Sequence, residues 1–107
     1  MKKYLQVKNP TKDTNVIKIE LYYSLGGYNC WYGKPEKRGY YLCVTPLYKS
    51  GYLESYTMFT GVKQCVKEVT RKSEKAYNAA IEKVNDILPG LLDLVCNQLN
   101  IEVIKND

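Results

Sequence analysis

The sequence predicts an α+β fold: a three-stranded antiparallel β-meander with room for a fourth short strand, followed by C-terminal helices packed on one sheet face. Residues 16–60 are rich in β-branched and aromatic side chains that alternate with polar ones, which is typical of strands with one buried face. After Gly61 the apolar residues recur every three to four positions, which is typical of amphipathic helices. The 107 residues suit a single domain with one core.

Residues 1–15 form an N-terminal arm, and the first clear strand begins at Val16. Within the arm, residues 4–7 (Tyr-Leu-Gln-Val) fit a short edge strand that the turn formers at 9–13 bring to an end. From Val16 onward one face has Ile17, Ile19, Leu21 and Tyr23, and the other has Lys18, Glu20, Tyr22 and Ser24. This alternation predicts a half-buried antiparallel strand.

Residues 26–38 form the longest connection, between the first and second strands of the meander. Glycines and Pro35 give this segment the composition of a loop. It also holds the chain's one tryptophan, Trp31, with Tyr32 beside it. Trp31 either folds back to cap one end of the core or is an exposed anchor for a partner, because tryptophan is buried on average yet enriched at interfaces.

Residues 39–60 have the pattern of a hairpin with its turn at Lys49-Ser50-Gly51. Alternation places Leu42 and Val44 on the face that the helices cover, which leaves a tyrosine-rich face on the other side. That face consists of Lys18, Tyr22, Tyr41, Thr45, Tyr52, Glu54 and Tyr56. An exposed aromatic patch is typical of an interaction site, and ordinary cross-strand packing of the tyrosines is the alternative.

Residues 61–99 are predicted to be mostly helical, and residues 100–107 to form a tail or a short strand. The side chains expected to pack on the sheet are Val62, Val66, Val69, Ala76, Ala80 and Val84. The pattern allows one long helix or two that meet near Ser73, a suitable cap. Pro89 should stop or kink the helix, and the leucines of 91–99 should form a last short helix.

The residues missing from the sequence exclude most kinds of catalysis. Histidine is absent, which removes His-dependent nucleophilic mechanisms, histidine general bases and nearly all catalytic zinc sites. No phosphate-binding or dinucleotide-binding glycine motif and no calcium loop is present. The four cysteines include no Cys-x-x-Cys pair, so we expect reduced, structural thiols rather than a metal site. The sequence therefore predicts a protein that is not an enzyme and needs no cofactor or metal.

The net charge of +5 is unevenly distributed. Residues 1–60 carry +5 and residues 61–75 carry +3, whereas residues 76–107 carry −3. On the predicted first helix, Lys63, Lys67, Arg71 and Lys75 recur every four residues and would form a basic stripe. Such a stripe is either solvated surface or a ridge that binds phosphates.

Two resemblances accompany these patterns. The segment Gly39-Tyr-Tyr-Leu-Cys-Val-Thr, with its hairpin and the helix expected after it, is similar in outline, over residues 16–75, to three-stranded-sheet DNA-binding domains of the integrase N-terminal or AP2 type. That resemblance implies binding through a sheet face. The segments Arg38-Gly-Tyr-Tyr, Phe59-Thr-Gly-Val-Lys and Val69-Thr-Arg-Lys-Ser resemble small uncharacterised proteins of phages and mobile elements in gut Firmicutes.

We therefore expect a small cytoplasmic binding protein of phage or mobile-element origin that contacts nucleic acid through a Tyr/Lys-rich sheet face and a basic helix stripe. The alternative is a phage-encoded inhibitor, of the anti-defence or anti-CRISPR type, that binds a larger host protein through Trp31 and the tyrosines. A homodimer through the tyrosine face is also compatible with the pattern, and a membrane partner is not expected. The predicted contact residues are Lys18, Tyr22, Trp31, Tyr32, Lys34, Lys37, Arg38, Tyr41, Tyr56, Lys63, Lys67 and Arg71.

Overall fold

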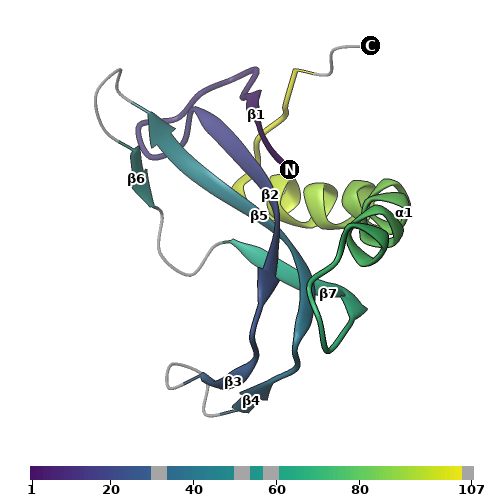
Figure 1. Ribbon diagram of the computed structural model, residues 1–107. Coiled ribbons are helices and arrows are strands. Elements are labelled where there is room, and N and C mark those ends of the chain that lie inside the picture. The colour runs from purple at the N-terminus through teal and green to yellow at the C-terminus, as the bar shows by residue number, and fades with distance from the viewer. Residues whose placement is uncertain (30–33, 50–53, 57–60, 105–107) are drawn as a thin grey trace.

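A five-stranded antiparallel sheet lies against one long helix in the computed structural model of the chain (Figure 1). The structure describes residues 1–29, 34–49, 54–56 and 61–104. The sheet contains β1 (Lys2–Gln6), β2 (Val16–Ser24), β5 (Gly39–Lys49), β6 (Glu54–Tyr56) and β7 (Val62–Glu68), and the helix is α1 (Glu74–Leu99). A separate two-stranded ribbon pairs β3 (Gly27–Asn29) with β4 (Lys34–Glu36). The predicted α+β class is confirmed.

The long strand β5 organises the sheet because it pairs with three other strands. Residues 39–47 of β5 pair with β2, from Ser24 opposite Gly39 to Val16 opposite Leu47. On its other side, residues 39–44 pair with β7 and residues 47–49 pair with β6. The antiparallel order β2-β5-β6 agrees with the meander predicted for residues 16–60, although residues 50 and 51 of the predicted turn lie outside the described residues. Strand β1 is the edge strand predicted for the N-terminal arm.

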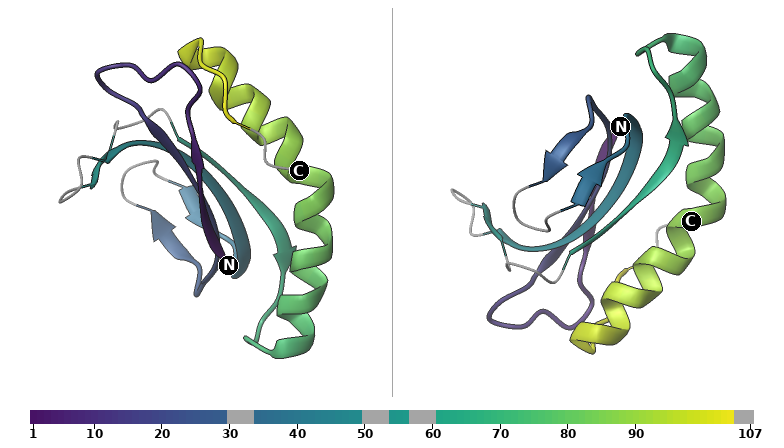
Figure 2. Two further views of the ribbon diagram at one scale, coloured as in Figure 1. Left: turned by 90° about the horizontal axis from the view of Figure 1, so that it is seen from above. Right: turned by 90° about the horizontal axis from the view of Figure 1, so that it is seen from below.

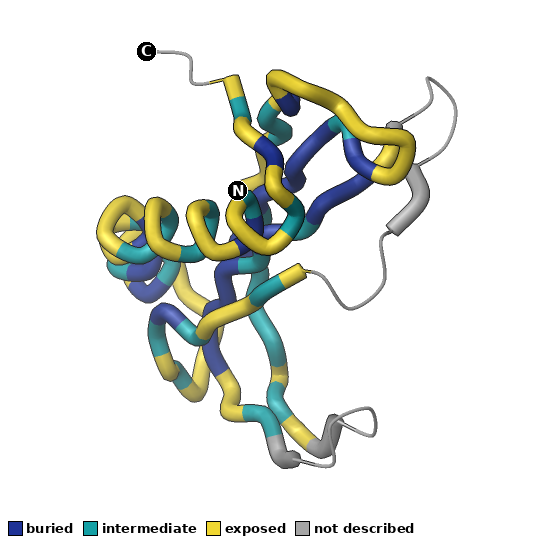
Figure 3. The backbone as a smooth tube through the Cα atoms, turned by 180° about the vertical axis from the view of Figure 1, so that it is seen from behind, coloured by how far each residue is buried: buried dark blue, intermediate teal, exposed yellow. Residues whose placement is uncertain are grey.

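The side of the sheet that faces α1 is the one that alternation predicted. Ile17, Ile19 and Leu21 of β2 are buried there, as are Leu42 and Val44 of β5. From the helix, the buried core residues are Ala76, Ala80, Val84 and Val95. Figure 3 shows the buried residues concentrated along the two central strands.

The prediction of a helix immediately after Gly61 is wrong, because residues 62–68 form strand β7. The predicted burial is nevertheless correct: Val66 is buried, and Val62 and Val69 pack against the core. Val62 and Val66 are four residues apart, an even spacing that fits one strand face. The odd spacing from Val66 to Val69 still reaches the core because the register with β5 shifts between Tyr40 and Tyr41, at a β-bulge.

Helix α1 begins where the sequence placed a cap and continues past the point where we expected it to end. The Ser73 hydroxyl accepts a hydrogen bond from the Ala76 backbone N–H at 3.1 Å, so Ser73 is the N-cap. Of the two alternatives expected at Pro89, a stop or a kink, the stop and the separate last helix are wrong, because α1 runs through Pro89 to Leu99 as one curved helix (Figure 2). Pro89 and Gly90 face solvent, so water can hydrate the carbonyl that proline leaves unpaired. Within the described residues, no helix has the length and apolar character needed to cross a membrane.

The segment after α1 returns to the N-terminal arm. Asn100 ends the helix in a left-handed conformation, and Ile101 is buried. Val103 then forms an antiparallel bridge with Val7, flanked by hydrogen bonds from the Lys8 N–H to the Glu102 carbonyl and from the Ile104 N–H to the Gln6 carbonyl. The short strand predicted near residues 101–104 is therefore present as a single bridge.

The segment expected to be a long open loop contains the β3-β4 ribbon. Figure 2 shows the sheet curving strongly, with α1 on its convex side and the ribbon on its concave side. Trp31 and Tyr32 lie outside the described residues, so the prediction that either is an anchor stays a prediction. Through the ribbon, the concave face of the sheet acquires contacts that the sequence did not suggest.

Candidate functional site

The concave face carries the tyrosine pair that the sequence singled out. Tyr22 of β2 lies directly opposite Tyr41 of β5, and their rings stack with centroids 6.0 Å apart. Tyr41 is only 6% exposed, however, and its hydroxyl donates to the Lys37 carbonyl at 2.7 Å. The expectation that Tyr41 is exposed is therefore wrong, because the chain that follows the ribbon hydrogen-bonds back onto it. Lys18, on the same face, is also buried, at 8% exposure.

Glu36 at the end of β4 connects the ribbon to the concave face. Its Oε2 accepts a hydrogen bond from the Ser24 hydroxyl at 2.9 Å, and its Oε1 forms an ion pair with Lys63 of β7. The Lys63 ammonium also lies 5.3 Å from the centroid of the Tyr41 ring. Three separate segments are thereby joined around one half-buried carboxylate. Lys63 therefore pairs with a carboxylate of the protein itself, and it lies on strand β7 rather than on the basic helix stripe that the sequence predicted.

The Glu36 contacts predict how stability changes in acid. The hydrogen bond from Lys63 is the main reason that the pKa of Glu36 lies below its ordinary value of 4.5. Because the folded pKa is below the unfolded one, ionised Glu36 stabilises the fold at neutral pH, and this stabilisation is lost as the pH falls through the folded pKa. Glu36→Gln should lower the melting temperature at neutral pH and make its decline in acid shallower.

Thermal denaturation followed by circular dichroism, between about pH 3 and pH 7, measures this effect. Glu82→Gln is the matched control because Glu82 is an exposed carboxylate on α1, away from the ribbon. Parallel curves for the parent protein and Glu36→Gln would contradict the prediction.

Two reactive groups of the concave face, Cys43 and Tyr22, favour their neutral forms. Burial raises the pKa of the Cys43 thiol and that of the Tyr22 hydroxyl next to it. A protonated thiol is a poor nucleophile, so these pKa shifts favour a structural role for Cys43. Cys43, Cys65 and Cys96 are all half-buried.

A second region gathers cationic residues that the sequence had placed on different elements. We call residues 37–38 and 67–75 the basic corner. They contain Lys37, Arg38, Lys67, Arg71, Lys72 and Lys75, with Glu68 and Glu74 as the acidic members, and therefore carry +4 of the chain's net charge of +5. An open hollow of about 690 Å³ lies at its centre, lined by Lys37, Arg38, Glu68, Val69, Thr70, Arg71, Ser73 and Ala76.

Contacts of Arg38 and Lys37 connect the segments around the hollow. The Arg38 guanidinium donates from Nε to the Leu25 carbonyl at 2.9 Å and from one terminal nitrogen to the Thr70 carbonyl at 3.4 Å. It therefore connects the end of β2 to the turn between β7 and α1. Lys37 forms an ion pair with Glu68 at 2.8 Å, and a hydrogen bond between these side chains raises the pKa of Lys37. Arg71 lies exposed in the same turn.

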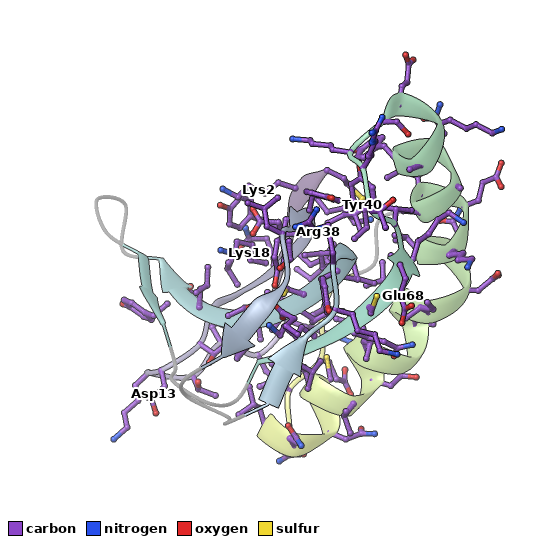
Figure 4. All side chains as sticks on the ribbon, turned by 60° about the horizontal axis from the view of Figure 1, so that its bottom comes forward. Lys2, Asp13, Lys18, Arg38, Tyr40 and Glu68 are labelled. Carbon is purple, nitrogen blue, oxygen red and sulfur yellow. The ribbon has the colours of Figure 1, made fainter. Side chains whose placement is uncertain are left out.

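Figure 4 shows the charged tips of side chains projecting from the outer side of α1, and it places Asp13 far from Arg38 and Glu68. Of the predicted contact residues, the structure brings Lys37, Arg38 and Arg71 together, with Lys67 adjacent in the chain to Glu68 of the hollow. Tyr22, Tyr41, Lys18 and Lys63 belong to the concave face instead. The backbones of Lys34 and Tyr56 lie in β4 and β6, and their side chains, like Trp31 and Tyr32, fall outside what the structure describes.

Sequence reasoning missed Glu68, Thr70 and Ser73 as parts of the hollow. The net charge of residues 61–75 pointed to this region, but no local pattern showed that Lys37 and Arg38 would join it. That proximity comes from the β5-β7 pairing, which brings Gly39 opposite Glu68. No protein-family model, no curated protein and no solved structure matches the chain.

Proposed function

We propose that this protein binds nucleic acid through the phosphate backbone, at the basic corner. The observation that carries the proposal is the gathering of Lys37, Arg38 and Arg71 around one open hollow, within a region that holds +4 of the net charge. Clustered Lys and Arg side chains attract the closely spaced phosphates of a nucleic acid, and binding releases condensed counterions. The arrangement therefore supports electrostatic, sequence-independent binding.

The three cations would contribute in different ways. Arg38 uses two guanidinium N–H groups for backbone carbonyls, which fixes its position and leaves other N–H groups for a phosphate. Arg71 is exposed in the turn before α1 and lines the hollow. Lys37 forms an ion pair with Glu68, so a phosphate would compete with that carboxylate for the Lys37 ammonium. Binding should be favourable but moderate, because a surface ion pair is weak and exchanges readily.

The buried ring of Tyr41 bears on which part of the nucleic acid is recognised. Base stacking needs an accessible aromatic face, whereas Tyr41 is stacked on Tyr22 and approached by Lys63. The described residues thus favour contacts to the backbone over contacts to bases. Backbone contacts position a protein on a nucleic acid without reading its sequence.

The salt dependence of oligonucleotide binding tests the proposal. Fluorescence anisotropy should show that affinity for single- or double-stranded oligonucleotides falls steeply between about 50 and 200 mM salt. Arg71→Ala should weaken binding to all sequences similarly and reduce the slope of log K against log salt by about 1.

Lys83→Ala is the matched control because it removes the one cation of residues 76–104, on α1 outside the basic corner. Equal slopes for Arg71→Ala and Lys83→Ala would show that the corner is not the site. Binding to a host protein that persists at high salt, without oligonucleotide binding, would instead support the inhibitor hypothesis, whose expected anchor Trp31 is outside the described residues.

A further inference from the structure

A groove at the far end of α1 has the properties of a docking site. It is lined by Leu92, Asp93, Cys96, Asn97, Ile101, Glu102 and Val103, and its volume is about 290 Å³. The bridge between Val103 and Val7 and the two flanking hydrogen bonds fix one wall, and the last turns of α1 form the other. The groove is therefore a built feature with apolar side chains in its lining and two carboxylates among them.

The electrostatics of this groove favour a cationic partner. Asp93 and Glu102 are both exposed, and the last turn of α1 has no basic residue to offset the negative end of the helix dipole. Glu102 has a long ion pair with Lys8, at 3.7 Å, that is largely exposed and therefore weak. Residues 76–104 contain four acidic side chains and one basic side chain, a net charge of −3.

Leu25 has the complementary properties. Its side chain is 70% exposed, the highest value among the exposed large apolar residues of the described chain. Its backbone is fixed, because its carbonyl accepts from Arg38 and the next N–H, that of Gly26, donates to the Ser24 hydroxyl at 3.1 Å. An apolar side chain on an ordered backbone, with Arg38 bonded to its carbonyl and Lys37 next to Arg38 in the chain, is pre-organised to enter a groove lined by apolar side chains and carboxylates.

We propose that Leu25 of one copy of this chain docks in the α1 groove of a second copy, with Lys37 and Arg38 facing Asp93 and Glu102. Figure 2 shows the end of β2 and the end of α1 at opposite ends of the molecule, so one chain cannot make this contact with itself. The contact is heterologous: it uses a different surface on each copy and leaves one groove and one Leu25 free at the ends of the assembly. It therefore generates head-to-tail chains or a closed ring.

Lys37 and Arg38 take part in both proposed contacts, so a second copy and a nucleic acid would compete for them, but the two contacts can be separated by mutation. Leu25→Ser changes no charge, so it should weaken assembly and, at protein concentrations too low for assembly, leave oligonucleotide affinity within about twofold. Arg71→Ala should have the larger effect on oligonucleotide affinity. If the expected effect on assembly is not observed, the proposed nucleic-acid binding still stands, and the reverse is also true.

Sedimentation velocity of the full chain measures assembly directly. At about 50 mM salt the weight-average mass should rise with protein concentration, and moderate salt should lower it because the charged rim is screened. Leu25→Ser and Asp93→Lys should each weaken association by about tenfold or more. The matched controls are Tyr48→Ser, which removes another exposed apolar side chain, and Glu82→Lys, which reverses another exposed charge on α1.

Mixing the two variants gives the decisive result. Leu25→Ser keeps an intact groove and Asp93→Lys keeps an intact Leu25, so their mixture should form dimers and nothing larger. A parent protein that stays monomeric up to millimolar concentration at low salt would overturn the proposal. So would variants that assemble as well as their controls, or a mixture that remains monomeric.

Discussion

Leu42→Ala should lower the free energy of unfolding by about 2–5 kcal/mol, one of the two largest effects that we expect from a single substitution. Leu42 is 0% exposed and lies near the middle of β5, between Leu21 of β2 and Gln64 of β7. Its side chain faces α1, so truncation leaves a cavity between the sheet and the helix. Because domains of this size are stable by only about 5–15 kcal/mol, the variant would approach the limit of stability.

Urea denaturation followed by circular dichroism measures this loss. Leu94→Ala is the matched control because Leu94 is 46% exposed on α1 and its truncation should change stability by no more than about 0.5 kcal/mol. If the two alanine variants had similar midpoints, the sheet-helix interface would not be the core of the protein.

The burial of Leu42 shows which part of the fold could be predicted from local pattern. A strand has two faces with a fixed period, so the polar neighbours of Ile19 and Leu42 were enough to assign the face that the helix covers. The cap at Ser73 was equally local, since it needs only a hydroxyl three residues before the N–H that it accepts from. Predictions of this kind were correct because each depends on residues adjacent in the chain.

Strand β7 shows why another part could not be predicted. Val62, Val66 and Val69 fit the helical period, and a β-bulge in the pairing with β5 lets the same spacing reach the core from a strand. The β-branched valines favour a strand, but propensity is a weak signal beside periodicity. A bulge is a property of two paired strands, so one strand's sequence does not reveal it.

The candidate site was predictable only where charge is local. The excess of cations in residues 61–75 is visible in the sequence, and Arg71 was found from it. The burial of Tyr41 could not be predicted, because it depends on Glu36 and Lys37. The turn at Gly26 and the β3-β4 ribbon bring these two residues back onto the concave face. Contacts between segments 27 residues apart, such as Lys63 with Glu36, follow from tertiary structure alone.

Gly39→Ala should lower the free energy of unfolding by an amount comparable to that of Leu42→Ala, although it adds only one methyl group. Gly39 begins β5 opposite Glu68, and a Cβ there would overlap the Lys67 carbonyl oxygen and lie 2.9 Å from the Glu68 Cα. Both obstacles are backbone atoms, so no side-chain rotation can make room. The first pairs of the β5-β7 ladder would have to separate, and we expect a cost of about 1–3 kcal/mol or more from overpacking.

Gly90→Ala is the control, and it should change stability in the opposite direction. Nothing lies within 4 Å of a Cβ at that exposed position of α1, and alanine favours a helix over glycine by about 1 kcal/mol, so this variant should be more stable than the parent. The Gly39 variant should also bind oligonucleotides more weakly even where it remains folded, because Arg38 and Lys67 flank the separated strands and their spacing would change. If Gly39→Ala melted like the parent protein, β5 and β7 could not be paired as closely as they are at the edge of the basic corner.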